Sequence, residues 1–220
     1  MKKSYYIIII LIMLVMAGWT LPVMGQEAGD IITFGSYEQD EQPGSDPIEW
    51  QVLAVENGRA LLISRYALAV RQYHKSWDKC TWEKSELRKW LNKDVYNSIF
   101  SKVEKSKVIE VLNINKDSQY AEGGKDTNDR IFLLSVDEAD QYFADDASRE
   151  CQAVYTVRQN GAYRNTSNGN TAWWLWSPGG NKGFATSVDN FGCVNPEGYS
   201  ATAEIAVRPA LMEFTEMAVL

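Results

Sequence analysis

Residues 47–68 read PIEWQVLAVENGRALLISRYAL, and this stretch decides the fold class. Two apolar runs, at 48–55 and 59–64, flank the dipeptide Asn57-Gly58. Both residues of the dipeptide accept the positive φ that a tight turn between antiparallel strands requires. The stretch therefore predicts a β-hairpin.

The segment after the hairpin changes to helical spacing. Seven apolar residues recur at that spacing between positions 81 and 100: Trp82, Leu87, Trp90, Leu91, Val95, Ile99 and Phe100. We expect Asn92 to break this segment into two short helices. We also expect Trp82, Trp90 and Leu91 to form one face that is buried against the hairpin.

The rest of the chain combines one more helix with short strands. Ser135 and Glu138 have the spacing of a capping box, which predicts the start of a helix. Residues 116–129 are polar, so we expect a loop or an insertion there. Further strands are expected at 31–34, 108–114, 131–134, 153–157, 173–176, 184–188 and 203–211. Residues 26–220 therefore predict a single α+β domain in which short helices pack on antiparallel hairpins.

The first 25 residues have the pattern of a secretory signal peptide. Lys2 and Lys3 are followed by an apolar run at 7–17 and by small residues up to Gly25. An uncleaved anchor is the alternative, because the apolar region nearly reaches the roughly 20 residues of a membrane-spanning helix. A glycine and a proline interrupt that region and favour cleavage after Gly25. We therefore expect a secreted or cell-surface protein with no membrane segment after cleavage.

The charge balance argues against nucleic acid as a partner. The full chain carries 22 Lys and Arg against 29 Asp and Glu, a net charge of −7. Removal of the signal segment makes the balance about two units more negative. No stripe of basic residues reverses it locally. Because an acidic surface repels phosphate backbones, we expect no nucleic acid partner.

The cysteines and the histidine do not indicate a particular catalytic site. Cys80, Cys151 and Cys193 are too few for a disulfide scaffold, and either one bridge or three unpaired thiols is compatible with the sequence. His74 is the only histidine and has no nucleophile motif beside it, so a Ser-His-Asp or Cys-His enzyme is not indicated. A hydrolase whose two catalytic carboxylates come together only in the folded protein stays an alternative.

Arg208 lies in the motif VRPAL on a late strand. The proline that follows it confines the segment to an edge strand or a strand end. We expect the guanidinium to be structural, with an Asp or Glu of the long loops as its partner.

Seven ordered motifs resemble those of one protein family. They are PIEWQVL, ALLIS, TWEKSELRKWLN, YNSIF, DRIFLLSVDEA, WWLWSPGG and VRPAL. With them the chain resembles, over nearly its whole mature length, a family of secreted bacterial proteins defined only as domain of unknown function 6273. That family usually has arginine where this chain has Trp176. It is distantly similar to C-type-lectin-like domains and formylglycine-generating enzymes, which implies a C-type-lectin-like fold here but transfers no catalytic residue.

Two polar segments offer candidate ligands for calcium. Hard cations bind carboxylate and amide oxygens on loops. The candidates are Asp126, Asn128 and Asp129 in the first segment, and Asp189 and Glu197 in the second. The alternative is that these residues form turns, because Asp, Asn and Gly are favoured there for backbone reasons. Neither segment matches an EF-hand loop.

Residues 173–176 read WWLW and precede the turn-forming SPGG. In a strand, Trp173 and Leu175 share one face, and the leucine indicates that this face is the core. Trp174 and Trp176 share the other face. Because the family tolerates arginine at the last position, we expect Trp176 to be exposed or at an interface. The alternative is that Trp176 packs under a neighbouring loop.

These observations favour an exported module that binds a ligand. Exposed indoles stack on sugar rings, and amide and carboxylate oxygens bind the hydroxyls. The predicted site comprises Trp174, Trp176, Asn181, Asp189, Asn190 and Asn195. A glycan or a surface protein is the expected partner. One alternative is an extracellular enzyme, either a carboxylate hydrolase or an oxidase that uses Cys151 and Cys193; another is a purely structural module.

Overall fold

The computed structural model describes residues 25–159 and 165–215. Residues Gln26–Thr215 form one compact unit. The predicted signal peptide falls on residues 1–25 and so lies almost wholly outside the described residues. Within the described part of the chain, no helix has the length and apolar character needed to cross a membrane.

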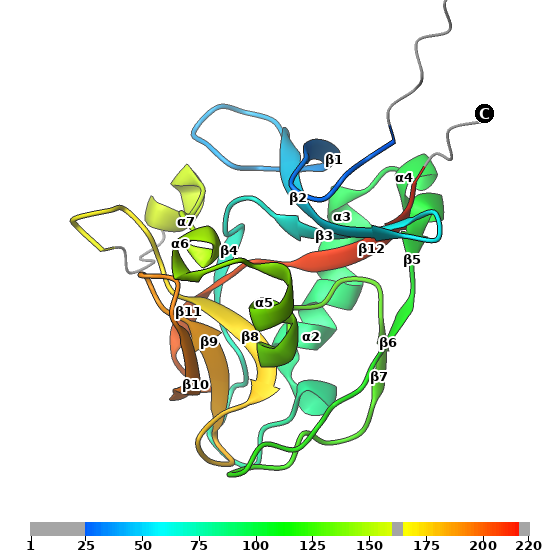
Figure 1. Cartoon of the computed structure of the whole chain (residues 1–220). Coiled ribbons are helices and arrows are strands. Elements are labelled where there is room, and N and C mark those ends of the chain that lie inside the picture. Colours follow the sequence, from blue (N-terminus) through cyan, green and yellow to red (C-terminus); the bar gives the residue numbers. More distant parts are fainter. Residues whose placement is uncertain (1–24, 160–164, 216–220) are drawn as a thin grey trace, which may run out of the picture. The chain divides into compact units, whose positions relative to one another are not determined.

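The first sheet has the predicted hairpin near its centre (Figure 1). Its strands, in spatial order, are β1 (Ile31–Tyr37), β2 (Asp46–Glu56), β3 (Arg59–Ser64), β12 (Ala210–Phe214) and β5 (Val108–Ile109). Asn57 and Gly58 have φ of 51° and 72°, so the turn between β2 and β3 has the left-handed conformation that the sequence predicts. β12 pairs antiparallel with β3 and β5, which joins late and early parts of the chain.

A second five-stranded sheet is built mainly from the second half of the chain. Its strands, in spatial order, are β10 (Val194–Ser200), β9 (Phe184–Val188), β8 (Trp173–Pro178), β11 (Glu204–Val207) and β4 (Ala69–Gln72). All neighbours are antiparallel except β11 and β8. A separate antiparallel pair is formed by β6 (Val111–Asn113) and β7 (Thr127–Asp129). The architecture is thus α+β with mostly antiparallel sheets.

Short helices connect the strands. They are η1 (Trp82–Lys84), α2 (Glu86–Trp90), η2 (Leu91–Val95), α3 (Tyr96–Ile99), α4 (Lys102–Lys107), α5 (Val136–Tyr142), α6 (Asp146–Arg149) and α7 (Tyr155–Gln159). The predicted capping box of Ser135 and Glu138 is confirmed at the start of α5, and Ser101 with Glu104 forms another at α4. Such caps satisfy backbone N–H groups that the first helical turn leaves unpaired.

The prediction that Asn92 breaks the helical segment is wrong. The run from Glu86 to Ile99 is continuous through the π-helical turn η2. The Asn92 amide instead reaches across to a neighbouring segment, where it donates to the Ile131 carbonyl at 2.8 Å and accepts from Arg130 N at 2.7 Å. Asn92 therefore holds the residues after β7 against the helix.

Other predictions for local structure also need correction. Residues 108–114 and 203–211 each form two strands, β5 with β6 and β11 with β12, where the sequence predicts one. Residues 155–159 form α7, although 153–157 was expected to be a strand. The polar segment 116–129 ends in β7, and β10 was not predicted. Residues 131–134 are buried but join a sheet only through a bridge at Phe132.

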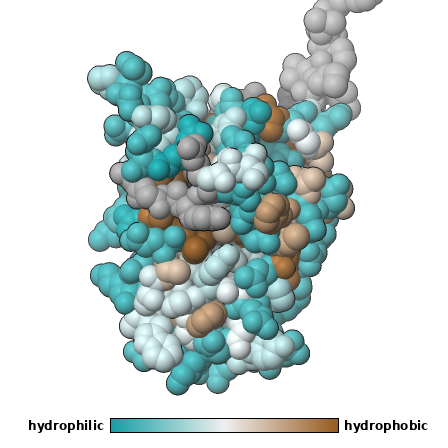
Figure 2. Space-filling model, turned by 90° about the vertical axis from the view of Figure 1, so that its left-hand side faces the viewer, coloured by the Kyte–Doolittle hydropathy of each residue, from teal (hydrophilic) through white to brown (hydrophobic). Residues whose placement is uncertain are grey.

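The core contains most of the tryptophan. Trp50, Trp82, Trp173 and Trp174 are fully buried, whereas Trp90 is only partly buried. The expected burial therefore holds for Trp82 and Leu91 and fails for Trp90, and η1 and α2 contact β8 and β4, which lie outside the hairpin. Hydrophilic residues cover most of the side of the molecule that carries α6, α7 and β10, and hydrophobic ones show as small separate patches (Figure 2).

Arg208 is buried, as a structural arginine would be, but its partners are not carboxylates. Its Nε donates to the Ser64 carbonyl at 2.9 Å, and Nη1 donates to the Arg149 carbonyl at 3.3 Å. The guanidinium also lies 5.1 Å from the ring centre of Trp173 and 5.4 Å from that of Phe143. Burial lowers the pKa of this arginine. Backbone oxygens and aromatic faces therefore replace the acidic partner that was expected.

Candidate functional site

Trp174 does not offer a surface for stacking. Its side chain is fully buried, and its Nε1 donates to the Arg71 carbonyl at 2.9 Å. The rings of Tyr73 and Tyr199 lie edge-on to it, with centres at 5.6 and 6.4 Å. Trp174 therefore joins β8 to β4 inside the fold.

The prediction that Trp176 is exposed is wrong, because the residue is buried and its backbone pairs with Leu134 and Tyr73. The residue is only 5% exposed. Its backbone N donates to the Leu134 carbonyl at 2.9 Å, and its carbonyl accepts from the Tyr73 hydroxyl at 2.9 Å. The pairing of β8 with β9 shifts register after Trp174, so simple alternation of faces does not hold up to Trp176.

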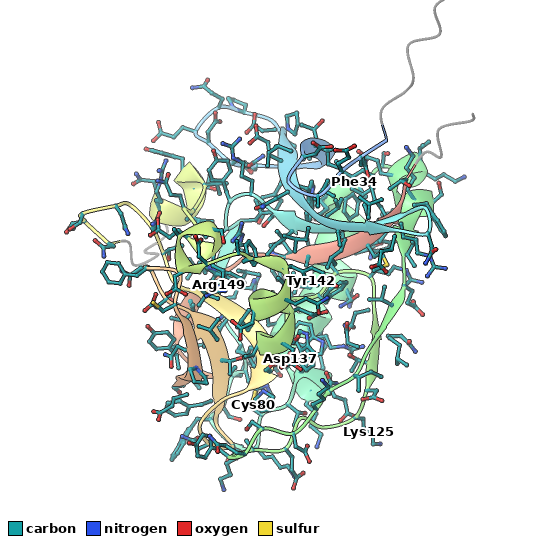
Figure 3. All side chains as sticks on the ribbon, in the orientation of Figure 1. Phe34, Cys80, Lys125, Asp137, Tyr142 and Arg149 are labelled. Atoms are coloured by element: carbon teal, nitrogen blue, oxygen red, sulfur yellow. The ribbon has the colours of Figure 1, made fainter. Side chains whose placement is uncertain are left out.

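One edge of Trp176 nevertheless borders an open groove of about 740 Å³, which we call the Trp176 groove. Its walls are residues 112–120, the first turn of α5, and residues 176–178 at the end of β8. In Figure 1, α5 lies between β8 and the β6–β7 pair. Figure 3 labels Asp137, which belongs to the first turn of α5 and lines the groove.

The outer wall of the groove is unusually apolar for a surface. Leu112, Ile114 and Tyr120 are 59%, 51% and 55% exposed, and all three line the groove. Exposed apolar side chains that gather in one place mark binding sites more often than scattered ones do. The gathering therefore distinguishes this groove from an ordinary surface hollow.

The conformation of the loop presents Tyr120 at the rim. The Ser118 hydroxyl accepts from Tyr120 N at 3.2 Å and from Ala121 N at 3.0 Å, which closes a tight turn. The same hydroxyl lies 3.4 Å from the Gly179 carbonyl just beyond β8. The loop is thus tied to the strand that carries Trp176.

Polar groups at the other wall are mostly engaged. Lys116 Nζ lies 2.8 Å from Asp137 Oδ2, and this hydrogen bond raises the pKa of Lys116. Glu138 caps α5 through Ser135, at 2.7 Å from its backbone N. Trp176 is the exception, because its Nε1 is buried with no hydrogen-bond partner among the described residues.

Sequence reasoning missed the apolar wall, because the residue alternation there predicts the opposite faces. In the stretch VLNIN, residues 111–115, the structure places the apolar Leu112 and Ile114 outside and the polar Asn113 and Asn115 inside. This is the reverse of the usual alternation in a half-buried strand.

The other predicted ligand-binding residues act mainly in turns and are not part of the groove. Asn181 Oδ1 accepts from Gly183 N at 2.9 Å. Asp189 Oδ1 accepts from Phe191 N at 2.8 Å and from Cys193 N at 3.0 Å. Asn195 Oδ1 accepts from Gly198 N at 3.1 Å, and the Asn190 carbonyl accepts from Asn168. These contacts support the turn-forming interpretation of the segment.

The calcium candidates do not converge in the described part of the structure. No group of three or more His, Cys, Asp or Glu side chains there is placed to hold a metal ion. Asp126 accepts from Asn115 N at 2.9 Å, while Asn128 contributes its carbonyl to Arg88. Glu197 lies on β10, away from the 126–129 segment in sequence and in strand pairing.

Asp129, the most buried calcium candidate, is instead a structural carboxylate. Only 1% of it is exposed. Its two oxygens accept hydrogen bonds of 2.6–3.2 Å from Trp82, Arg88, Asn92, Asn113 and Thr127. A carboxylate with so many donors has no lone pair directed at a further cation. Asp129 therefore belongs to the scaffold.

The cysteines are unpaired in the structure. Cys80 and Cys151 are buried, and Cys193 is exposed. Burial raises the pKa of the Cys80 thiol to about 12, and burial also raises the pKa of Cys151. The hydrogen bond of Cys193 to Asp146, at 3.3 Å, raises the pKa of that thiol as well. Raised pKa values leave little of the reactive thiolate near neutral pH.

Comparison with known proteins assigns the chain to a family without assigning a function. No curated protein and no solved structure matched the chain. One family model matches residues 57–212, which include the second sheet, α5 and both walls of the Trp176 groove. The chain therefore belongs to the family described as Domain of unknown function (DUF6273).

Proposed function

We propose that the chain is an exported recognition module that binds a saccharide in the Trp176 groove. The observation that carries this proposal is the Trp176 indole, which lines the groove while its Nε1 has no partner among the described residues. A buried donor without a partner costs about 1–3 kcal/mol. A ligand oxygen that accepts from Nε1 would recover that cost. Because Nε1 is covered by protein atoms, binding requires the side chains over it to move.

The exposed wall supports a sugar as the ligand. A pyranose ring has an apolar C–H face that packs on an aromatic ring, and Tyr120 offers such a ring with 55% of its surface exposed. Leu112 and Ile114 extend the apolar contact. Small-molecule sites combine such apolar walls with a few directed polar groups.

The ion pair at the rim supplies the polar part of the site. Lys116 and Asp137 are about 70% exposed in their side chains and can turn toward a ligand. The ammonium donates to sugar oxygens, and the carboxylate accepts from sugar hydroxyls. Together with Nε1 of Trp176 they would fix the orientation of a ring that Tyr120 holds only by stacking.

Binding is a better proposal than hydrolysis for the same groove. A glycosidase needs one carboxyl as acid and another as base or nucleophile. In the first turn of α5, Glu138 caps the helix and Asp137 is paired with Lys116. Glu138 is thus engaged in the helix cap, which leaves Asp137 as the one carboxylate of this turn that can meet a ligand, where hydrolysis needs two.

Two wider expectations remain part of the proposal. Export is supported by Lys2 and Lys3 ahead of the apolar run at 7–17, which is the pattern of a signal peptide. A relationship to C-type-lectin-like domains is supported by the order of the motifs and by an α+β fold with mostly antiparallel strands. A protein partner would use the same apolar wall, and the experiment below distinguishes it.

The proposal is tested by applying the chain from residue 26 onward to a glycan array. We expect binding to a defined set of saccharides and loss of that binding in Tyr120→Ala. Phe191→Ala is a matched control, because Phe191 is also 55% exposed and does not line the groove. Absence of any glycan signal, or equal loss in the two variants, contradicts the proposal. In the first case a surface protein becomes the ligand to test.

A further inference from the structure

A second groove, of about 650 Å³, lies elsewhere in the unit and shares no residue with the Trp176 groove. It is formed by the end of β1, strand β4, helix α2 and helix α7. We call it the Arg71 groove, because Arg71 of β4 has the most distinctive environment in it. The inference below does not depend on the saccharide proposal for Trp176.

Arg71 is an exposed arginine held in one orientation. Its guanidinium carbon lies 4.2 Å from the ring centre of Trp90, within the range of a cation–π contact. The Trp174 Nε1 hydrogen bond to the Arg71 carbonyl fixes the backbone from the other side. Within residues 25–159 and 165–215, the guanidinium has no ion pair and no hydrogen bond. Its N–H groups are thus oriented by the stacking and have no partner among the described residues, so solvent and a ligand can reach them.

This environment also explains why Trp90 is not fully buried. Its ring lines the groove and stacks under the Arg71 guanidinium. An arginine stacked on an aromatic ring loses less conformational freedom on binding a planar anion than an unstacked arginine does, because its guanidinium group is already held in place.

Among the described residues, the groove is lined by two cations and three acids, so it suits no more than one anionic group, placed at Arg71, together with hydroxyls. Lys75 adds a second cation, whereas the nearby Glu86 is engaged by Lys75 N and by His74. Glu38 and Glu204 are exposed acceptors that line the same groove. They oppose a strongly charged anion but can accept hydrogen bonds from hydroxyl groups.

We propose that the Arg71 groove binds the carboxylate of a hexuronate residue in an acidic saccharide. The planar carboxylate matches the guanidinium fork of Arg71 with two parallel hydrogen bonds. Lys75 adds to the attraction, and Glu38 and Glu204 bind the ring hydroxyls. A neutral sugar lacks the first of these contacts, and a doubly charged phosphate meets the repulsion of both glutamates.

The test is a calorimetric titration of the full chain with a galacturonate trisaccharide, a neutral galactose trisaccharide and inorganic phosphate. We expect the galacturonate to bind, with an affinity that falls at higher salt. Arg71→Gln is expected to lower that affinity by about tenfold or more. Arg71→Lys should also weaken it, because an ammonium cannot make the paired contact.

Arg130→Gln serves as the matched control, because Arg130 also lies over an aromatic ring, at 5.4 Å from the centre of Tyr96, and is outside the groove. It should bind like the wild type. The inference is overturned if galacturonate does not bind at millimolar concentration or if Arg71→Gln binds it unchanged. Equal binding of the neutral trisaccharide, or tighter binding of phosphate, overturns the assignment of the ligand class.

Discussion

The indole Nε1 of Trp82 lies 2.9 Å from Oδ2 of Asp129, and both side chains are buried. This contact joins η1 to β7 across 47 positions of sequence. Arg88 Nε reaches the other oxygen of the same carboxylate at 2.6 Å. A buried carboxylate is stable only when its charge and its lone pairs are satisfied, as they are here.

Replacement of Asp129 by alanine should therefore destabilise the fold strongly. The substitution leaves the donors of Trp82, Asn113 and Thr127 without their acceptor and leaves Arg88 without its counter-charge. We expect a loss of about 3 kcal/mol or more in the free energy of unfolding. Urea unfolding followed by circular dichroism measures it. A loss below about 1 kcal/mol would mean that Asp129 is not a central structural residue.

The two tryptophans of the helical segment should differ in their contribution to stability. Trp82 is fully buried, so Trp82→Ala should cost about 3–5 kcal/mol. Trp90 is partly buried and supports Arg71, so Trp90→Ala should cost clearly less. Thermal unfolding of the two variants side by side checks this order. If Trp90→Ala is the more damaging, the description of the Arg71 groove is wrong.

Thiol labelling should separate the three cysteines. Cys193 is exposed, whereas Cys80 and Cys151 are buried and their pKa values are raised by burial. The folded chain should react at one thiol with a disulfide reagent, and at all three after unfolding in denaturant. Because the pKa of Cys193 is also raised, its labelling should become faster as the pH rises. Peptide mapping that finds Cys80 or Cys151 labelled in the folded chain contradicts the structure.

Glu104 should give the fold part of its sensitivity to acid. Burial acts to raise the pKa of this carboxyl, but hydrogen bonds from Ser101 and from Gly35 N outweigh it, so the pKa is lowered. The stabilisation is therefore complete above the unfolded-state pKa of about 4.3, and it is lost as the pH falls through the lower folded-state value.

Glu104→Gln should consequently be less stable than the wild type at pH 7, and the difference should vanish in acid. Glu204→Gln is the control, because Glu204 is exposed and caps no helix. Unfolding midpoints measured from pH 7 to pH 2 give the comparison. A stability difference between Glu104→Gln and the wild type that does not change with pH would falsify the role of the Glu104 carboxylate.

Local features were predictable from the sequence because neighbouring residues determine them. The Asn57-Gly58 turn and the Ser135–Glu138 capping box need only a few adjacent positions. The alternation of WWLW correctly placed Trp173 in the core. The sequence predicts α5 and the hairpin correctly because caps and tight turns depend on residues that are close together in the chain.

Features that depend on distant segments were not predictable in the same way. Trp176 is buried where the β8–β9 register shifts and where Leu134 and Tyr73 pair with its backbone, and neither feature is visible in its own strand. Trp90 is partly exposed because β4, which carries Arg71, pairs with β11 at the edge of the second sheet. The sequence predicts a helix break at Asn92 because the hydrogen-bond partners of its side chain, Arg130 and Ile131, come almost 40 positions later in the chain.

The most direct test of the proposed function is the affinity of Trp176→Phe for the strongest saccharide found on the array. Phenylalanine keeps an aromatic ring and removes Nε1, which bonds to no described residue; because the smaller ring lowers stability at this buried position, the affinity is measured for the folded fraction. Trp174→Phe is the matched control, because it loses an internal hydrogen bond to Arg71 and does not line the groove. Titration calorimetry should show that Trp176→Phe binds the saccharide about 1–3 kcal/mol more weakly than the wild type does. Trp174→Phe should be less stable than the wild type, but its folded fraction should bind with wild-type affinity. Wild-type affinity in Trp176→Phe would contradict the account.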